Sequence, residues 1–231
     1  PLRELRNQQL SDFDAVFLAS VSSLDVLETR MLAKYLQSGG GVVWTVGSGV
    51  DVQRLADSWK GVVPGETIDF DDISERGDVR FDPGDYGHPI LAAFSGQPRS
   101  GLLSTRVYQH LIIHTQSEGT PVLGLQGGNP IMVSGAVLNG TTDTGRWIFV
   151  AIPWGDVEPE QPWSEFTISP AFVPLVHETL TWVMRRPHSQ RTVIVGEPLR
   201  FPAMPSRSAE ITDPSGQRHS IVADEGQGFL F

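Results

Sequence analysis

The most regular hydrophobic pattern of the chain lies between residues 14 and 49 and predicts one strand–helix–strand unit. Two apolar runs, 15–19 and 42–46, are rich in Val and aromatic residues and show no polar alternation. Parallel strands that are covered on both faces have this composition. Between the runs, apolar residues recur at helical spacing and predict one buried stripe: Leu24, Leu27, Met31, Leu32, Tyr35 and Leu36.

Polar residues and a glycine mark the two ends of this helix. Either Ser22 with Asp25 or Asp25 with Glu28 supplies the pattern of a capping box. Gly39 stands where a helix commonly ends in a left-handed residue. The start and stop signals agree with the periodicity, so the unit indicates an α/β fold.

The segments that follow predict an antiparallel extension of the sheet and a closing helix. Residues 51–59 favour a second short helix, whereas Asp, Gly, Pro and Arg in 66–101 indicate a surface excursion with short strands. Strands are expected at 107–115, 121–125, 131–138 and 146–152, the middle two forming a hairpin around 126–129. Ser169 as cap and Pro170 as first residue are expected to open a last helix that ends at 185–187.

The expected architecture is therefore a flavodoxin-like or amidotransferase-like parallel sheet, flanked by helices and extended by antiparallel strands. After residue 187 the pattern changes to short apolar pieces between prolines and glycines, beginning with a strand at 192–195. We expect an α/β domain at 1–188 and a β-rich extension at 189–231. Forty-odd residues are too few for an independent sandwich, so the extension either packs on the main domain or, as we expect, is the start of a truncated sandwich module.

Composition excludes several function classes. The formal charge of −10 argues against nucleic acid as a partner, because phosphate binding needs a concentrated basic surface. No apolar run approaches the length of a membrane helix, and the first residues contain no signal-peptide core. We therefore expect a soluble chain, and its abrupt start near a strand and apolar end at 228–231 lead us to expect a fragment excised from a longer protein. The absence of cysteine removes disulfides, thiolate metal sites and thiol catalysis.

Two stretches resemble a known family. The run 13–18, followed by the helix and by 35–43, resembles the opening of class I glutamine amidotransferase-like domains. The stretch 163–166, followed by 172–178, resembles such a domain in bacterial membrane proteins of the Bat aerotolerance type, which also contain a von Willebrand A domain. The resemblance spans most of residues 10 to 186. It implies a cell-envelope location, on the periplasmic side of a membrane-anchored protein, with membrane contact only through segments outside this sequence.

The catalytic residues of that family do not carry over. Active amidotransferases place a cysteine on a sharp strand-to-helix turn and a histidine and glutamate later in the chain. Here the turn is 46–49, its serine is Ser48, and no His-x-Glu pair follows a strand. Ser48 remains a weak candidate nucleophile, since it stands at a strand end between glycines, but the Gly-x-Ser-x-Gly elbow is absent. Candidate bases are His88, His110, His114 and His177.

Two further groups of residues suggest binding. His110 and His114 are four apart on an expected strand, so both face the same side and could hold a metal, although ordinary exposed strand residues are the simpler interpretation. The acids of 66–101 lack the spacing of a calcium loop. We expect no metal and no cofactor. Trp154, Asp156 and Trp163 follow a strand end and could form a recognition surface, unless the tryptophans anchor the loop in the core.

Three functional hypotheses follow from these residues. The favoured one is a non-catalytic amidotransferase-like interaction or scaffold domain, whose partners are domains of the same or associated envelope proteins. The second is a hydrolase or transferase that uses Ser48 or a carboxylate pair. The third is a small-ligand or carbohydrate-binding domain in which Trp154 and Trp163 are both exposed beside one cleft.

Overall fold

A computed structural model describes the chain with several gaps. The described residues are 5–6, 8–63, 68–74, 79–97, 99–115, 119–139, 142–155, 162–184, 200–201, 208–212, 216–222 and 229–230. The chain divides into two compact units, Pro1–Arg185 and Arg186–Phe231. This boundary lies close to the one expected at residue 188.

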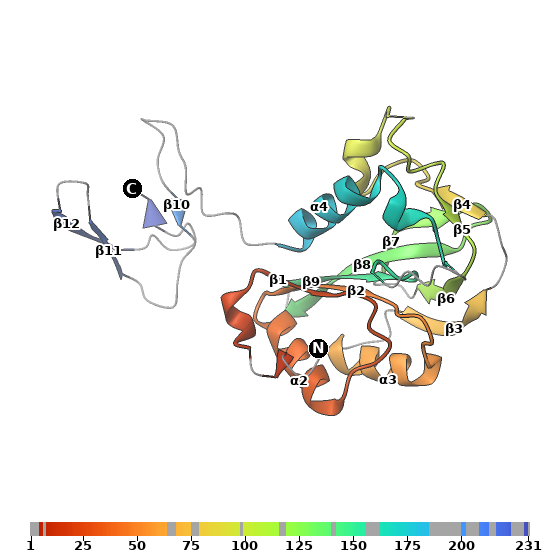
Figure 1. The fold of residues 1–231 in the computed structure, drawn as a ribbon. Helices are drawn as coiled ribbons and strands as arrows, with labels where there is room; N and C mark the ends of the chain where they lie inside the picture. The colour runs from red at the N-terminus through yellow and green to blue at the C-terminus, as the bar shows by residue number, and fades with distance from the viewer. Residues whose placement is uncertain are drawn as a thin grey trace. The chain divides into compact units, whose positions relative to one another are not determined.

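A seven-stranded sheet forms the centre of the first unit (Figure 1). Its order is β1-β2-β9-β8-β7-β4-β5. The bounds are Ala15–Leu18 (β1), Gly41–Thr45 (β2), Thr142–Val150 (β9), Pro130–Asn139 (β8), Thr120–Leu125 (β7), Val79–Asp82 (β4) and Arg106–Val107 (β5). The pairs β1–β2 and β2–β9 are parallel, and every later pair is antiparallel. The expected α/β fold, a parallel sheet with an antiparallel extension, is confirmed.

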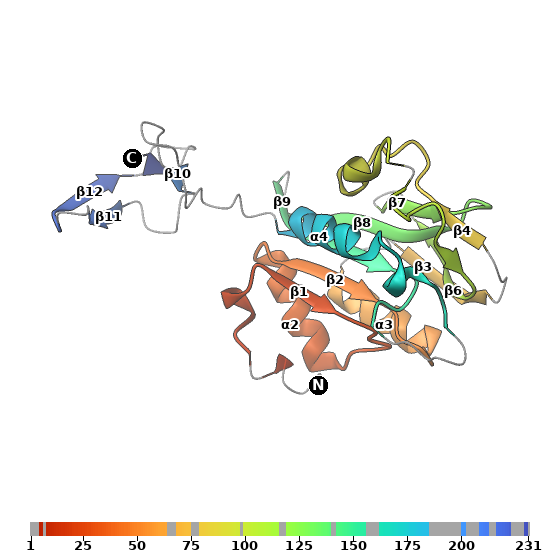
Figure 2. The same cartoon turned by 45° about the horizontal axis from the view of Figure 1, so that its top comes forward.

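Helices cover both faces of this sheet. Figures 1 and 2 show α2 (Val26–Gln37) and α3 (Val52–Val62) on one face and α4 (Phe172–Val183) on the other. Short 3-10 helices complete the unit: η1 (Leu10–Asp12), η2 (Pro89–Phe94) and η3 (Phe166–Ile168). A separate two-stranded sheet pairs β3 (Ile68–Ser74) with β6 (His110–Thr115). None of the helices among the described residues is both long and apolar enough to cross a membrane.

The first strand–helix–strand unit forms as the sequence predicts. The Asp25 carboxylate accepts from the Glu28 amide, and the Glu28 carboxylate accepts from the Asp25 amide. This capping box is the second of the two expected patterns. Gly39 has a φ of 96°, as a left-handed helix end requires. Leu27 is an exception, because it lies in the first turn and is 51% exposed rather than buried. Glu28 takes a buried place in that turn, where Arg6 pairs with it.

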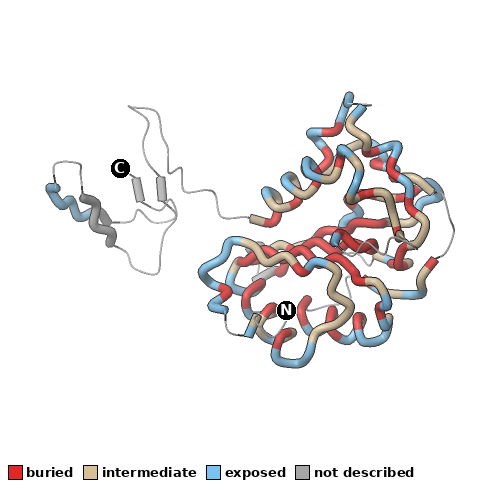
Figure 3. The backbone as a smooth tube through the Cα atoms, in the orientation of Figure 1, coloured by how far each residue is buried: buried red, intermediate tan, exposed pale blue. Residues whose placement is uncertain are grey.

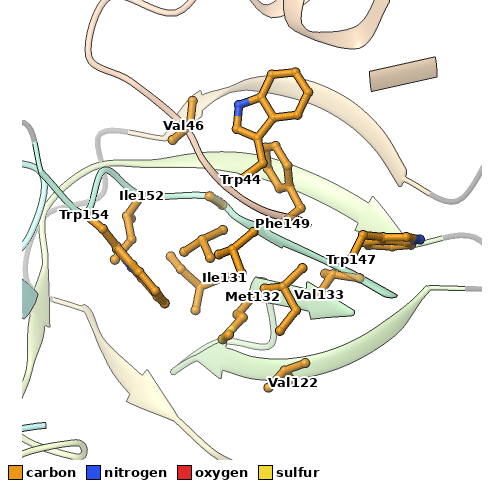
Figure 4. Packing of buried hydrophobic residues seen from close by; sticks show 14 of the residues in the cluster. Trp44, Val46, Val122, Ile131, Met132, Val133, Trp147, Phe149, Ile152 and Trp154 are labelled. Atoms are coloured by element: carbon orange, nitrogen blue, oxygen red, sulfur yellow. The ribbon is translucent and has the colours of Figure 1, made fainter. Parts of the chain in front are cut away.

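Aromatic side chains pack in the core between α3 and the sheet. Figure 3 shows that the central strands are largely buried, and Figure 4 shows Trp44, Trp147 and Phe149 among the buried side chains. The Trp59 ring of α3 lies 5.0 Å from Trp147 and 5.1 Å from Phe149 of β9, and 5.9 Å from Trp44 of β2. All four side chains are at most 1% exposed. Aromatic pairs at these distances add stability beyond the area that they bury, so α3 is held to the parallel half of the sheet mainly through Trp59.

Three local predictions are wrong. Residues 66–101 are not only a surface excursion, because β4 and η2 place apolar side chains in the core: Phe81, Ile90, Leu91 and Phe94. The expected strand 107–115 is split, since the amides of Tyr108 and Gln109 both donate to the Trp163 carbonyl and separate β5 from β6. Helix α4 begins at Phe172 with Ala171 as N-cap, so Ser169 and Pro170 precede the helix.

The second unit is described only in short strands. β10 (Arg200–Phe201) pairs with β13 (Phe229–Leu230), and β11 (Ser208–Thr212) pairs with β12 (Arg218–Val222), both antiparallel. These pairs agree with a β-rich extension. The strand expected at 192–195 lies outside the described residues.

Candidate functional site

The carboxyl ends of the parallel strands are where open α/β sheets place their sites. The loop after β1 lies against the loop after β2: the Ser20 amide donates to Thr45 Oγ1 at 2.8 Å, and the Val21 amide donates to the Thr45 carbonyl at 3.0 Å. A Cβ on Gly47 would stand 2.5 Å from the Ser20 carbonyl oxygen, so only glycine fits there. Backbone therefore occupies the space directly beside Gly47.

Ser20 has an unusual backbone conformation at this edge. Its φ is 54°, a region that non-glycine residues rarely adopt. The two hydrogen bonds to Thr45, one from Ser20 and one from Val21, hold the turn in place. Such conformations persist only where the surrounding structure enforces them, and here the enforcement comes from the end of β2.

Ser48 lies next to this edge, but the four candidate histidines belong to other parts of the fold. The Ser48 carbonyl accepts a hydrogen bond of 3.5 Å from the Ser22 hydroxyl, which ties the loops after β1 and β2 together. The histidines are distributed over other elements: His88 caps η2, His110 and His114 lie on β6, and His177 lies on α4. His114 Nε2 lies 3.7 Å from Asp71 Oδ2, and His177 Nδ1 lies 3.7 Å from Glu178 Oε1.

A serine–histidine contact that sequence reasoning missed occurs elsewhere. His88 Nε2 lies 3.2 Å from the hydroxyl of Ser134, a buried residue of β8. The Ile90 amide donates to His88 Nδ1 at 3.3 Å, and the Ser134 hydroxyl donates to the Thr120 carbonyl at 3.3 Å. No spacing in the sequence could reveal this pair, because it joins residues 46 positions apart through the antiparallel half of the sheet.

The hydrogen-bond directions argue against base catalysis by this pair. Because Nδ1 accepts from Ile90, we assign the proton of the neutral ring to Nε2, which then donates to Ser134. A general base would need a free lone pair on Nε2 to take the serine proton. The pair instead ties η2 to β8.

Burial lowers the pKa of His88, and the charge of Arg146 lowers it further. Arg146 lies on β9, donates to the Trp182 carbonyl at 3.0 Å, and stacks its guanidinium 4.8 Å from the Trp182 ring. The His88 ring also contacts Trp182, with ring centroids 5.2 Å apart. A neutral His88 is therefore the form that this part of the fold favours.

His110 and His114 do not form a common exposed site. His110 is 2% exposed, whereas the His114 side chain is 63% exposed and lies 3.7 Å from Asp71. The expectation that both lie on one exposed face is therefore wrong, because the first residue of β6 is covered. Across the described part of the chain, no three His, Asp or Glu side chains come together in a way that could hold a metal ion.

Trp154 and Trp163 are buried, which contradicts the hypothesis of two exposed indoles beside a cleft and agrees with the alternative that the tryptophans anchor the loop. They are 5% and 7% exposed. The Trp154 ring lies 5.3 Å from Phe166, 5.7 Å from Phe17 and 6.2 Å from Phe172. Trp154 therefore anchors its loop to β1 and to the start of α4. Asp156 lies outside the described residues.

Apolar side chains are exposed at the start of α4 and just before it, whereas the exposed residues farther along the helix are His177 and Thr181. Ile168 and Val173 are 81% and 72% exposed, and Leu103 is 43% exposed. The loop of Leu103 touches this region, since Thr105 Oγ1 donates to Ser169 Oγ at 3.0 Å. Val26 and Leu27 are also exposed, but they lie on a helix whose outer surface carries charged residues, Asp25, Arg30 and Lys34. Soluble monomers seldom leave contiguous apolar surface uncovered without a use for it.

Comparison with known proteins supports the fold. No protein-family model and no curated protein matches the chain. Two solved structures described as cytoplasmic proteins of Salmonella typhimurium both reach a TM-score of 0.53, at 16% and 19% identity. The alignments cover 79% and 74% of this chain and 74% and 72% of theirs. A ThuA-like protein of Bacteroides uniformis reaches 0.52 at 14% identity and covers 79% of this chain and 74% of its own. At these identities the similarity shows the fold alone.

Proposed function

We propose that the first unit is a non-catalytic amidotransferase-like domain that acts as an interaction or scaffold module. The observation that carries this proposal is a group of exposed apolar side chains at the start of α4 and just before it: Ile168, Pro170, Val173 and Pro174. Helix α4 contains one carboxylate, Glu178, and one histidine, His177, and its other ten residues are uncharged. A helix of this composition is usually covered on all sides, yet Val173 is 72% exposed. The surface is therefore suited to a protein partner.

The composition of the chain, the packing at Gly47 and the hydrogen bonds of His88 support the same proposal. The chain contains no cysteine, and the strand-end turns pack closely at Gly47. The serine–histidine contact between Ser134 and His88 has its hydrogen bonds directed against base catalysis. These features are typical of a scaffold that has kept its shape and lost its reactive groups.

The cellular part of the proposal rests on the sequence resemblance to Bat-type proteins. In that setting the domain would lie on the periplasmic side of a membrane-anchored protein and bind domains of the same or associated envelope proteins. Fractionation of cells that express the full-length gene product tests this part. Recovery of the full-length protein in the soluble cytoplasmic fraction would contradict it.

The non-catalytic part is tested by turnover. Purified protein is assayed for glutaminase and generic esterase activity and for labelling by a fluorophosphonate, together with Ser48→Ala and Ser134→Ala. We expect no turnover above buffer and no labelling of any of the three proteins. Turnover that disappears in Ser48→Ala would show instead that the chain is a serine hydrolase or transferase.

A further inference from the structure

We propose that His88 is an acid-sensitive latch, whose neutral ring holds η2 against α4 and whose protonation favours a state in which η2 has opened. His88 stands directly before η2 and caps it, and η2 packs against α4 and β7. The His88 ring contacts the Ser134 hydroxyl on β8 and the Trp182 ring in the last turn of α4. This inference concerns the conformation of the first unit and does not rest on the proposed interaction role.

Both nitrogens of the neutral His88 ring have a partner. Nδ1 accepts from the Ile90 amide at 3.3 Å, and Nε2 lies 3.2 Å from the Ser134 hydroxyl. That hydroxyl donates to the Thr120 carbonyl at 3.3 Å, so its oxygen can accept from Nε2. One neutral tautomer therefore satisfies all of these bonds, and its only lone pair, on Nδ1, is already used by Ile90.

A second proton on the ring has no favourable position. It would bind Nδ1 and face the N–H of Ile90, so that two donors would meet where one hydrogen bond now exists. The bond that caps η2 would be lost, and a charge would stand in a half-buried place. Protonation therefore drives the ring toward solvent and away from Ile90.

The elements around the ring provide no carboxylate to stabilise a charged form. η2, β7 and β8 contain no charged residue. On α4, His177 and Glu178 lie 3.7 Å from each other. Just before His88, the carboxylates of Asp82 and Asp85 accept from backbone amides of their own loop. Among the described residues, we find no carboxylate that forms an ion pair with the His88 ring.

Arg146 on β9 adds a positive charge close to the ring. Its guanidinium carbon lies 4.8 Å from the centre of the Trp182 ring, and the His88 ring lies 5.2 Å from that same ring. Asp143, the other charged residue of β9, pairs with Leu138 near the hairpin end of the β8–β9 ladder. Burial and the charge of Arg146 both lower the pKa of His88, so a protonated ring is less stable in its present place than in water.

The opened state follows from the position of His88 in the chain. The residue lies half-buried in the loop before η2, so its side chain can turn toward solvent while the sheet stays in place. This movement removes the cap of η2 and the ring contact with Trp182 together. Ile90, Leu91 and Phe94 of η2 are buried, so the opened state is a minor one at neutral pH and gains population as protons bind.

Hydrogen exchange of backbone amides, followed by NMR on the whole chain from about pH 8 to about pH 5, tests the latch. Exchange is expressed as a protection factor, which removes the intrinsic effect of pH. The amides of Ile90 and Leu91 both donate to His88, so they report its state. Their protection should be constant above the ordinary histidine pKa of about 6.5 and should fall by up to about tenfold per pH unit below it.

Low concentrations of urea separate local opening from unfolding of the whole unit. Local opening exposes little surface, so the exchange of Ile90 and Leu91 should not respond to urea, whereas amides of β2 and β9 should exchange faster as urea is added. Exchange of Ile90 and Leu91 only through the urea-dependent unfolding of the sheet would overturn the latch.

Two variants assign the effect to His88. His88→Asn keeps a side-chain oxygen that can accept from Ile90 but has no group that titrates in this range, so the protection of Leu91 should no longer depend on pH. His177→Asn is the matched control, because His177 is a histidine of α4 whose side chain is 76% exposed. It should behave like the unaltered chain.

Two outcomes would contradict the latch. Protection of Leu91 that does not change with pH in the unaltered chain would overturn it, whether or not His88→Asn folds. An equal fall in the unaltered chain and in His88→Asn would assign the opening to another group and would also overturn it. Because neither a binding partner nor turnover is measured, these outcomes leave the proposed function as it stands.

Discussion

Replacing Trp154 with alanine separates an anchoring role from a ligand-binding role for this residue. Trp154 is 5% exposed and contacts Phe17, Phe166 and Phe172, which belong to three different elements. Truncation of a buried tryptophan typically costs about 3–5 kcal/mol of unfolding free energy, and a whole domain has only about 5–15 kcal/mol. We therefore expect Trp154→Ala to fold only marginally, if the residue is an anchor.

Trp154→Phe refines this expectation. Among the described residues, the buried indole Nε1 of Trp154 has no hydrogen-bond partner, and leaving such a group unpaired costs about 1–3 kcal/mol. Phenylalanine keeps a ring beside Phe17 and Phe166 and removes that unpaired group. We expect the loss for Trp154→Phe to stay below about 2 kcal/mol, well under the loss for alanine.

Urea unfolding followed by circular dichroism measures both values. With a slope of about 1–3 kcal/mol per molar urea, a loss of about 4 kcal/mol moves the midpoint by roughly 1–4 M. Val26→Ala serves as the control, because Val26 is 68% exposed, and its effect should stay within about 0.5 kcal/mol. A loss below about 1 kcal/mol in Trp154→Ala would refute the anchoring argument, since no buried aromatic anchor is that dispensable.

Three further predictions concern stability. Because His88 has a lowered pKa in the folded chain, its side chain takes up a proton at a higher pH in the unfolded chain than in the folded chain. The contribution of neutral His88 to the unfolding free energy should therefore be complete above the unfolded pKa of about 6.5 and should fall as the pH drops below it. Unfolding free energies measured against pH should show a shallower acid slope for His88→Gln, and an unchanged slope would contradict this assignment. Asp25→Ala removes both hydrogen bonds that cap α2 and should cost about 0.5–2 kcal/mol in urea unfolding, whereas Asp25→Ser should cost less. Gly145→Ala would place a Cβ against the Leu36 carbonyl at the end of α2 and should cost about 1–3 kcal/mol; a thermal midpoint equal to that of the unaltered chain would show that α2 and β9 can separate freely.

The elements that the sequence predicts well are those that local chemistry determines. Nearby residues mark both ends of α2: Asp25 and Glu28 at its start, and Gly39 just after its end. Asp51 marks the start of α3 in the same way. The hairpin between β7 and β8 follows from its Gly127-Gly128 turn, where both φ angles are positive. In each case the signal and the element that it specifies lie close together in sequence.

The features that escape prediction depend on distant residues. The break between β5 and β6 arises because the Trp163 carbonyl, more than fifty residues away, accepts the amides of Tyr108 and Gln109. The contact of His88 with Ser134 likewise depends on how η2 packs on the sheet. The sequence raises core anchoring of Trp154 as one alternative, but its ring partners Phe17, Phe166 and Phe172 follow only from the fold.

The parallel pairing of β2 with β9 has a consequence for how the protein is made. Gly41 pairs with Arg146, so at about 5–20 residues per second a ribosome needs roughly 5–20 s to deliver the partner of an already synthesised β2. Closing a loop of this length is slow. Until β9 has been synthesised, the apolar edge of the nascent β1–α2–β2 unit remains unpaired. This interval during translation is when a holding chaperone would protect the chain most effectively from aggregation.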